Sequence, residues 1–341
     1  NRREYGEEAE QVSAAYHFSD FNAGISHRFS KDNVLTFNVY GGLYKMRMSM
    51  MERNFFEEEG NRYEGYTKTG TDVRWGNLLS VLNWHNSISK QWYLESSAFF
   101  SRNFGHIGIS VEDDSWDEGE NYISVNQITR SLSDIAGARA FAVYTPSSSQ
   151  QLRFGGEMLY KSYSPEITSG LELKVPGYKY DDGTEKSCFY DAVEGSLYLE
   201  DEFSLFSFIK ANIGARASIF HTKSKTYAFL EPRVSLKAQC GPSSSFRFSY
   251  TEMNQSDHSI ATSYLDLPTD TWMPSTAKIK PIHSKQFAAG FYSRLPFGLD
   301  LTVEGWYKTL EHLYEYGGVA SLYPPIHTWE TEFIEGRGRS W

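Results

Sequence analysis

The chain has 341 residues, with 33 basic and 43 acidic side chains and a net charge of −10. This acidic balance argues against nucleic acid as a partner, because a phosphate-binding protein presents a basic face. Aromatic residues make up 16% of the chain, an abundance that excludes intrinsic disorder. No apolar run approaches the roughly 18–20 residues of a membrane-spanning helix.

Alternation of apolar and polar residues recurs along the chain and predicts about twelve β-strands. In one of them, Ile213 and Ile219 lie on one face, whereas Lys210 and Arg216 lie on the other. This period of two is that of a strand with one apolar face. In chain order, we expect strands near residues 15–29, 34–48, 72–86, 91–104, 131–144, 150–163, 190–203, 207–221, 226–239, 244–253, 284–294 and 299–311.

The lengths of these strands and their connections predict a membrane β-barrel. The strands are about twice as long as the usual 5–6 residues and suit a tilted crossing of a bilayer, which takes roughly 9–11 residues. Short turns alternate with long polar loops, and aromatic residues such as Trp92 and Trp306 lie near strand ends, as in barrels with interfacial girdles. The long loops are expected at residues 49–71, 105–130, 164–189 and 254–283.

The fold class is therefore all-β, a transmembrane antiparallel β-barrel. A soluble β-sandwich is the alternative that the strand pattern leaves open. If the short turns face the periplasm, the first strand descends from outside and the twelfth returns there. We therefore expect residues 1–341 to be an interior segment of a larger barrel, with no second domain.

Several sequence segments are specific enough to suggest a family. The most distinctive reads Leu-Pro-Thr-Asp-Thr-Trp-Met-Pro-Ser-Thr over residues 267–276. Strand segments that fit the same pattern occupy residues 20–23, 198–203, 231–236, 246–255 and 303–308. Together they resemble the barrel of TonB-dependent outer-membrane receptors, of the type preceded by a carboxypeptidase-regulatory-like domain. The resemblance is strongest over residues 190–310.

The resemblance implies a barrel of about 22 strands around a plug, of which this chain would supply about 12 strands and no plug. It implies active transport of a scarce nutrient (an iron chelate, cobalamin or an oligomer) across the outer membrane of a Gram-negative bacterium. The implied partners are the TonB energy-coupling complex, through the plug region, outer-membrane lipid and a small-molecule or oligomer ligand. The motifs of the glycan-uptake branch are not recognised, so a surface lipoprotein partner stays open. Neither a cofactor nor an enzyme activity is implied.

Two groups of residues are candidates for ligand binding. His258, Tyr264, Asp270 and Trp272 lie in the long loop at 254–283, and loops of this length are usually functional. Alternatively, the distinctive segment at residues 267–276, which we call the signature segment, folds back and packs inside the mouth of the barrel. The second group consists of cations expected on the lumen face, which either attract an anionic ligand or pair with acidic groups of the wall and plug. Its members are Arg139, Arg153, Lys210, Arg216, Arg233 and Lys237, of which Arg139, Arg216 and Arg233 are the ligand-binding candidates.

Other functions are less well supported by the sequence. A passive porin has the same strand pattern with an open lumen, so strand pattern alone does not separate it from a receptor. A barrel hydrolase needs a nucleophile paired with a histidine, and no sequence order points to such a pair. The acidic runs at 57–59 and 112–120 lack the spacing of an EF-hand, and the two cysteines form no CxxC motif. We therefore expect neither catalytic residues nor a metal site.

Overall fold

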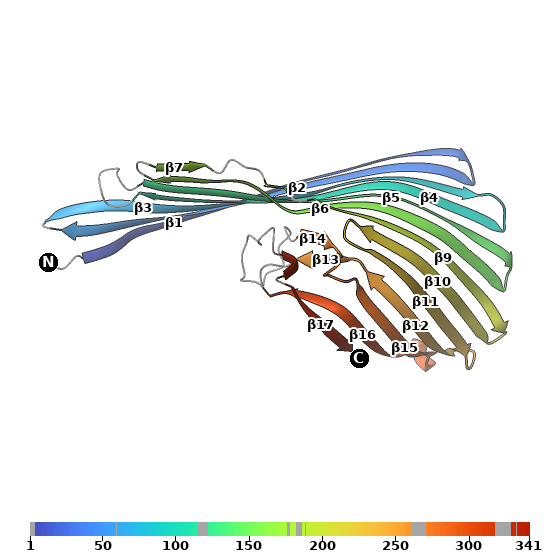
Figure 1. Cartoon of the computed structure of the whole chain (residues 1–341). Coiled ribbons are helices and arrows are strands. Elements are labelled where there is room, and N and C mark those ends of the chain that lie inside the picture. The colour runs from blue at the N-terminus through green and yellow to red at the C-terminus, as the bar shows by residue number, and fades with distance from the viewer. Residues whose placement is uncertain are drawn as a thin grey trace.

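The computed structural model describes residues 4–58, 60–114, 122–175, 178–181, 186–187, 189–260, 271–317, 329–331 and 333–341. They form one large antiparallel sheet and a separate two-stranded hairpin (Figure 1). The helical segments in these ranges are two 3-10 turns, Pro296–Gly298 and Trp329–Thr331. No helix in the described part of the chain is long and apolar enough to span a membrane.

The sheet has fifteen strands, and thirteen of them follow one another in chain order. Two short strands, β7 (Tyr178–Asp181) and β8 (Lys186–Ser187), pair with the outer part of β6. The hairpin is formed by β13 (Asp257–Ile260) and β14 (Thr271–Pro274). The ordered strands are β1 (Glu4–Ser30), β2 (Asn33–Glu58), β3 (Asn61–Ser87), β4 (Trp92–Asp114), β5 (Tyr122–Ser147), β6 (Gln150–Val175), β9 (Tyr190–Phe206), β10 (Ile209–Thr222), β11 (Thr226–Gln239), β12 (Ser244–Gln255), β15 (Ile282–Arg294), β16 (Asp300–Tyr316) and β17 (Phe333–Ser340).

All twelve expected strands are present, and the all-β fold is confirmed. The expected loops at 49–71, 105–130 and 164–189 are wrong in large part, because the strands continue through them. Strand β2 runs to Glu58 and β3 resumes at Asn61, while β4 runs to Asp114. Along the β4 extension, Ile107, Ile109 and Val111 alternate with His106, Gly108 and Ser110, but on the opposite face from Phe100 and Phe104, so the apolar pattern of the strand is interrupted although the backbone pairing continues.

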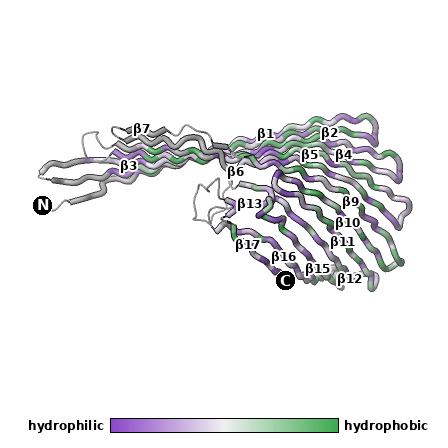
Figure 2. Tube along the Cα trace, in the orientation of Figure 1, coloured by the Kyte–Doolittle hydropathy of each residue, from purple (hydrophilic) through white to green (hydrophobic). Residues whose placement is uncertain are grey.

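The sheet has one apolar and one polar face along most of its length. Leu197, Ile219 and Leu230 point outward and are 71%, 56% and 67% exposed. Large apolar side chains left uncovered in a row are typical of a surface that faces lipid. Figure 2 shows the alternation of hydrophobic and hydrophilic residues along the strands. Near the short turns, the rings of Trp92 and Tyr144 stack with centroids 4.4 Å apart.

The sheet curves around a concave face on which the hairpin lies (Figure 1). The strands β1–β6 have 23–27 residues each and reach far beyond the ends of the later strands. The later strands β9–β16 of the sheet have 12–17 residues. Strands β1 and β17 end the order, so the sheet is an open wall rather than a closed barrel.

Candidate functional site

The end of β14 and the segment after it fold back onto the concave face and include several of the most deeply buried residues of the described chain. Met273 and Ser275 are fully buried, and Ile279 is 3% exposed. Met273 and Ile279 pack together, with the rings of Tyr190, Tyr314 and Phe333 against them. This burial supports the second interpretation of the signature segment, in which its Met-Pro-Ser-Thr part, residues 273–276, anchors the loop inside the mouth.

Buried ion pairs attach the hairpin to the wall. Lys161 on β6 is 6% exposed, and its Nζ donates to Oε2 of Glu194 at 2.7 Å and to Oδ2 of Asp257 at 2.5 Å. Glu194 belongs to β9 and Asp257 to the hairpin, so one ammonium group links three elements. Charge-assisted hydrogen bonds of this length are the stronger kind, and we call the three residues Lys161, Glu194 and Asp257 the lysine anchor.

Hydrogen bonds to the backbone secure the rest of the folded segment. The hydroxyl of Tyr227 on β11 donates to the carbonyl of Thr276 at 2.6 Å. The amide of Lys280 donates to the hydroxyl of Tyr314 on β16 at 2.9 Å. The segment is therefore tied to both sides of the concave face, and its buried polar groups have partners, as buried backbone groups require.

His258 is a structural residue of this packed region. It is 4% exposed, and its Nε2 shares a hydrogen bond of 2.9 Å with Oγ of Ser275. Its ring lies edge-on to the ring of Tyr314, with centroids 5.3 Å apart. Burial lowers the pKa of His258 to about 4, because a charged imidazolium is disfavoured away from water. The ring is therefore neutral at pH 7 and turned away from solvent.

The other candidates in the loop differ in their placement. Trp272 lies on β14 directly before the buried segment and is 43% exposed. It is therefore accessible to a ligand in the mouth. Tyr264 and Asp270 lie outside the described residues. The structure thus brings His258 and Trp272 onto one hairpin but gives them different environments.

The three predicted arginines lie on the concave face, where two of them engage wall residues. Nε of Arg139 donates to Oγ of Ser97 at 2.9 Å. Arg216 lies 3.5 Å from Glu157 and 3.8 Å from Glu194, and so joins the lysine anchor at its edge. Nε of Arg233 is buried without a hydrogen-bond partner. A buried donor in that state costs free energy, and Arg233 is the one of these three arginines with such a buried, unpartnered donor.

A second cationic group on the concave face combines Lys210 and Lys237, which the sequence also places on the lumen face, with Arg247, which sequence reasoning misses. Lys210, Lys237 and Arg247 lie directly opposite one another on β10, β11 and β12. Directly opposed like charges destabilise a sheet, yet this row of three cations spans neighbouring strands. In the sequence, each of these residues is recognisable only as a polar position of its own strand. The strand register of the structure is needed to show that the three lie side by side.

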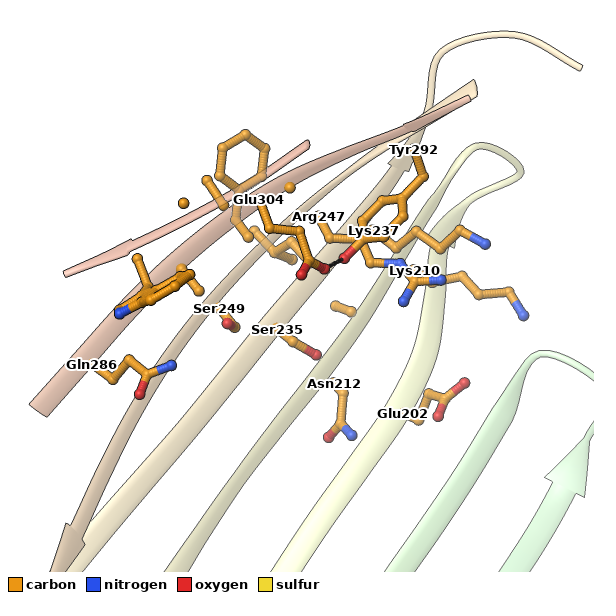
Figure 3. Close-up of a pocket in the computed structure, with 18 residues that line it drawn as sticks. Glu202, Lys210, Asn212, Ser235, Lys237, Arg247, Ser249, Gln286, Tyr292 and Glu304 are labelled. Atoms are coloured by element: carbon orange, nitrogen blue, oxygen red, sulfur yellow. Dashed lines mark hydrogen bonds between the residues drawn. The ribbon is translucent and has the colours of Figure 1, made fainter. Parts of the chain in front are cut away.

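The row borders a concave pocket of about 620 Å³ near the short turns. Figure 3 shows Lys210, Lys237 and Arg247 around it, with Glu202 and Glu304 at its sides. The guanidinium of Arg247 lies over the ring of Tyr292, 4.6 Å from its centroid, and Tyr292 donates to Glu304. Cations held beside a cavity attract anions, so the pocket suits an anionic group.

Metal chemistry finds no support in the described ranges, which hold no cluster of three histidine, cysteine or acidic residues that could bind a metal ion. The cationic row and the exposed Trp272 are suited to binding a charged or aromatic solute.

Solved outer-membrane receptors share this fold. The ferric-catecholate import receptor Fiu from E. coli K12 matches with 9% identity and a TM-score of 0.55, over 99% of this chain and 61% of its own. The pyoverdine receptor FpvA from Pseudomonas aeruginosa PAO1 matches with 10% identity and a TM-score of 0.54, over 98% of this chain and 57% of its own. In complex with pyocin S2, FpvAI matches with 10% identity and a TM-score of 0.53, over 98% of this chain and 53% of its own.

The chain therefore spans little more than half the length of these receptors, and the similarity is one of fold. No protein-family model and no curated protein matches the sequence.

Proposed function

We propose that this chain, whose fold is that of the barrel wall of TonB-dependent outer-membrane receptors, serves active uptake of a scarce nutrient across the outer membrane of a Gram-negative bacterium. The fold similarity to such receptors over nearly the whole chain is the observation that carries the proposal. The outward apolar face supports a position in lipid. The TonB energy-coupling complex would act on the complete receptor.

An anionic iron chelate is the ligand class that the concave face favours among iron chelates, cobalamin and oligomers. The row of Lys210, Lys237 and Arg247 supplies positive charge beside a cavity, although the whole chain is acidic. Fiu is a ferric-catecholate import receptor, and FpvA from Pseudomonas aeruginosa has been solved with ferripyoverdine bound. The ligands of these two receptors are iron compounds, which is consistent with an iron chelate as the ligand of this chain.

Ligand capture would begin at the mouth and continue along the concave face. Trp272 is exposed beside a rigid buried anchor, and an aromatic ring held in this way can stack against a planar ligand. Arg233, with its unpaired Nε, and the cationic row then offer charge deeper in the lumen. Tyr264 and Asp270 remain proposed members of the capture loop.

The same cationic row would also suit an anion-selective porin, which is the competing function. The two functions differ in their energy requirement, since a receptor needs the energised inner membrane whereas a porin leaks passively.

Uptake by whole cells separates these two functions. Cells carrying or lacking the complete gene are given an ⁵⁵Fe-labelled catecholate or hydroxamate chelate, or ⁵⁷Co-cobalamin, with and without a protonophore. Accumulation that requires both the gene and the proton gradient supports the receptor. In proteoliposomes, steady swelling in sugar solutions with the complete protein would instead establish a porin and overturn the proposal.

A further inference from the structure

The outward face of the early strands carries a sharp boundary between apolar and charged side chains. On β3, Leu78, Leu82 and Trp84 are 42%, 41% and 38% exposed. Because side chains alternate along a strand, Arg74 and Asp72 lie on that same outward face. They follow the apolar stretch directly, roughly a dozen residues from the short turn at the end of β3.

The neighbouring strand β2 repeats the pattern. Its outward-facing Phe37 and Leu43 are 41% and 51% exposed, and the next two outward positions are Lys45 and Arg47. The strand register places Lys45 opposite Arg74 and Arg47 opposite Asp72. The outward stretch Leu35 to Leu43 covers roughly 20 Å along the barrel axis at the usual rise and tilt, close to the apolar height of a membrane barrel.

These four residues form a compact group with an excess of positive charge, which we call the outer cationic cluster (Lys45, Arg47, Asp72 and Arg74). Asp72 lies 2.8 Å from Arg47, 2.5 Å from Arg74 and 3.5 Å from Lys45. One carboxylate therefore faces three cations. The side chains of Arg47 and Arg74 are 61% and 44% exposed, so they keep donors free for an outside partner.

A groove of about 550 Å³ crosses the sheet at this level. Small residues such as Ser49, Gly70 and Ser110 leave room along it, while Arg47 and Arg74 line it. His106 also lines the groove, and burial together with the charges of Arg74 and Arg130 lowers its pKa. Its ring is therefore neutral at pH 7, so the charge of the groove comes from the cluster.

A neighbouring ion pair on the same face shows what a balanced arrangement looks like. Arg102 on β4 pairs with Asp134 on β5 through two hydrogen bonds of 2.7 Å each. This pair has one cation for one carboxylate in a bidentate geometry, which satisfies both partners. The outer cationic cluster differs because, among the residues that the structure describes, Asp72 is the one carboxylate paired with its three cations.

We propose that the outer cationic cluster and its groove bind the phosphorylated headgroup of a membrane lipid. The position supports a lipid rather than a dissolved anion, because the groove begins where the apolar band ends and a headgroup would lie there with its chains along the band. Guanidinium groups are suited to phosphate because their donors match its oxygens. The inference depends on the membrane position proposed above, but not on any transport activity.

The test measures lipid retention by the complete protein in nanodiscs of phosphatidylcholine containing phosphatidic acid. The protein is released gently from the nanodiscs, and native mass spectrometry then counts the phosphatidic acid molecules that stay bound to it. The wild type should retain phosphatidic acid but not diacylglycerol, which has the same chains without the phosphate. Lys45→Gln/Arg47→Gln/Arg74→Gln should weaken retention by roughly a hundredfold, since each basic residue near a membrane surface contributes roughly a fivefold preference.

Arg102→Gln/Asp134→Asn is the matched control, because it removes a balanced pair on the same face. Retention should persist in this control and in the charge-keeping variant Lys45→Arg/Arg47→Lys/Arg74→Lys. Heat-modifiable mobility on a gel checks that each barrel is folded. If the triple glutamine variant does not fold, the exposed Arg47→Gln alone should still give a loss of roughly fivefold.

Three results would overturn the proposal. Unchanged retention in the glutamine variants would show that the cluster does not hold the lipid. An equal loss in the Arg102→Gln/Asp134→Asn control would show that replacing polar side chains elsewhere on this face weakens retention as much as loss of the cluster. Complete displacement by millimolar inorganic phosphate would show a site for a soluble anion. None of these results depends on uptake, so failure here is distinct from failure of the proposed transport function.

Discussion

Replacing Lys161 by methionine should release the folded-back segment from the concave face. The ammonium group of Lys161 is the shared partner of Glu194 and Asp257, whose side chains are only 20% and 21% exposed. Methionine keeps the length of the side chain but leaves the Asp257 carboxylate without its cation and leaves Glu194 with only the more distant Arg216, 3.8 Å away. Breaking a buried ion pair by removing one partner typically costs about 3–5 kcal/mol, which corresponds to at least a hundredfold more opening of the hairpin.

Hydrogen exchange of residues 271–281, read by mass spectrometry in nanodiscs, measures this opening directly. Lys237→Met is the matched control, because Lys237 lies on the same concave face opposite two other cations rather than beside a carboxylate pair. Protection should fall in Lys161→Met and stay unchanged in Lys237→Met. Equal protection of the segment in the wild type and Lys161→Met would refute the role given to the lysine anchor.

Three further predictions concern pH, like-charge repulsion and strand packing. Burial lowers the pKa of His258 to about 4, against about 6.5 for a free ring. The free energy that holds the hairpin in its packed position should therefore fall by up to about 3 kcal/mol as pH falls from 6.5 to 4. Trp272 fluorescence should report the opening, and His258→Gln should abolish this pH dependence. Lys237→Gln should stabilise the folded barrel by about 0.5–1 kcal/mol by relieving cross-strand repulsion, measured as a higher urea midpoint, and a lower midpoint would contradict it. Gly155→Val should reduce barrel assembly, because a Cβ at this position would lie 2.5 Å from the carbonyl oxygen of Ala140. Gly195→Val is the control, since no atom lies within 4 Å of a Cβ there, and it should assemble normally. Heat-modifiable mobility on gels measures assembly of both variants.

The sequence predicts the strands wherever one face of the strand is apolar and the other polar. The alternation around Ile213 is visible because an apolar side chain occupies every second position there. The chain from Ser49 to Glu58 pairs as strand, but its apolar residues come in adjacent pairs, Met50 with Met51 and Phe55 with Phe56, so they give no alternation. Strand β17 is missed for a related reason, since its Glu335, Arg337 and Arg339 break the alternation.

The contacts of the candidate site are less accessible to sequence reasoning. Lys161 and Asp257 are 96 residues apart in the chain, and nothing in either strand indicates that a later loop returns to β6. The opposed cations Lys210 and Lys237 depend on the register of β10 and β11, which follows from the geometry of a short turn. Sequence alone identifies each as facing the lumen, and the fold is needed to show that they are neighbours.

The burial of the signature segment bears on how such a wall could discriminate between ligands. Ser275 and Thr276 are 0% and 4% exposed, and Ile279 is 3% exposed, so the segment serves to fold the loop. Residues that hold a loop in place can stay the same while the ligand changes, because they do not touch it. Discrimination would then fall to side chains that the anchor presents to the mouth, such as Trp272, and to the charges of the concave face. A Trp272→Ala variant should therefore lose ligand binding while hydrogen exchange over residues 273–281 stays slow, and loss of both together would show that Trp272 is part of the anchor.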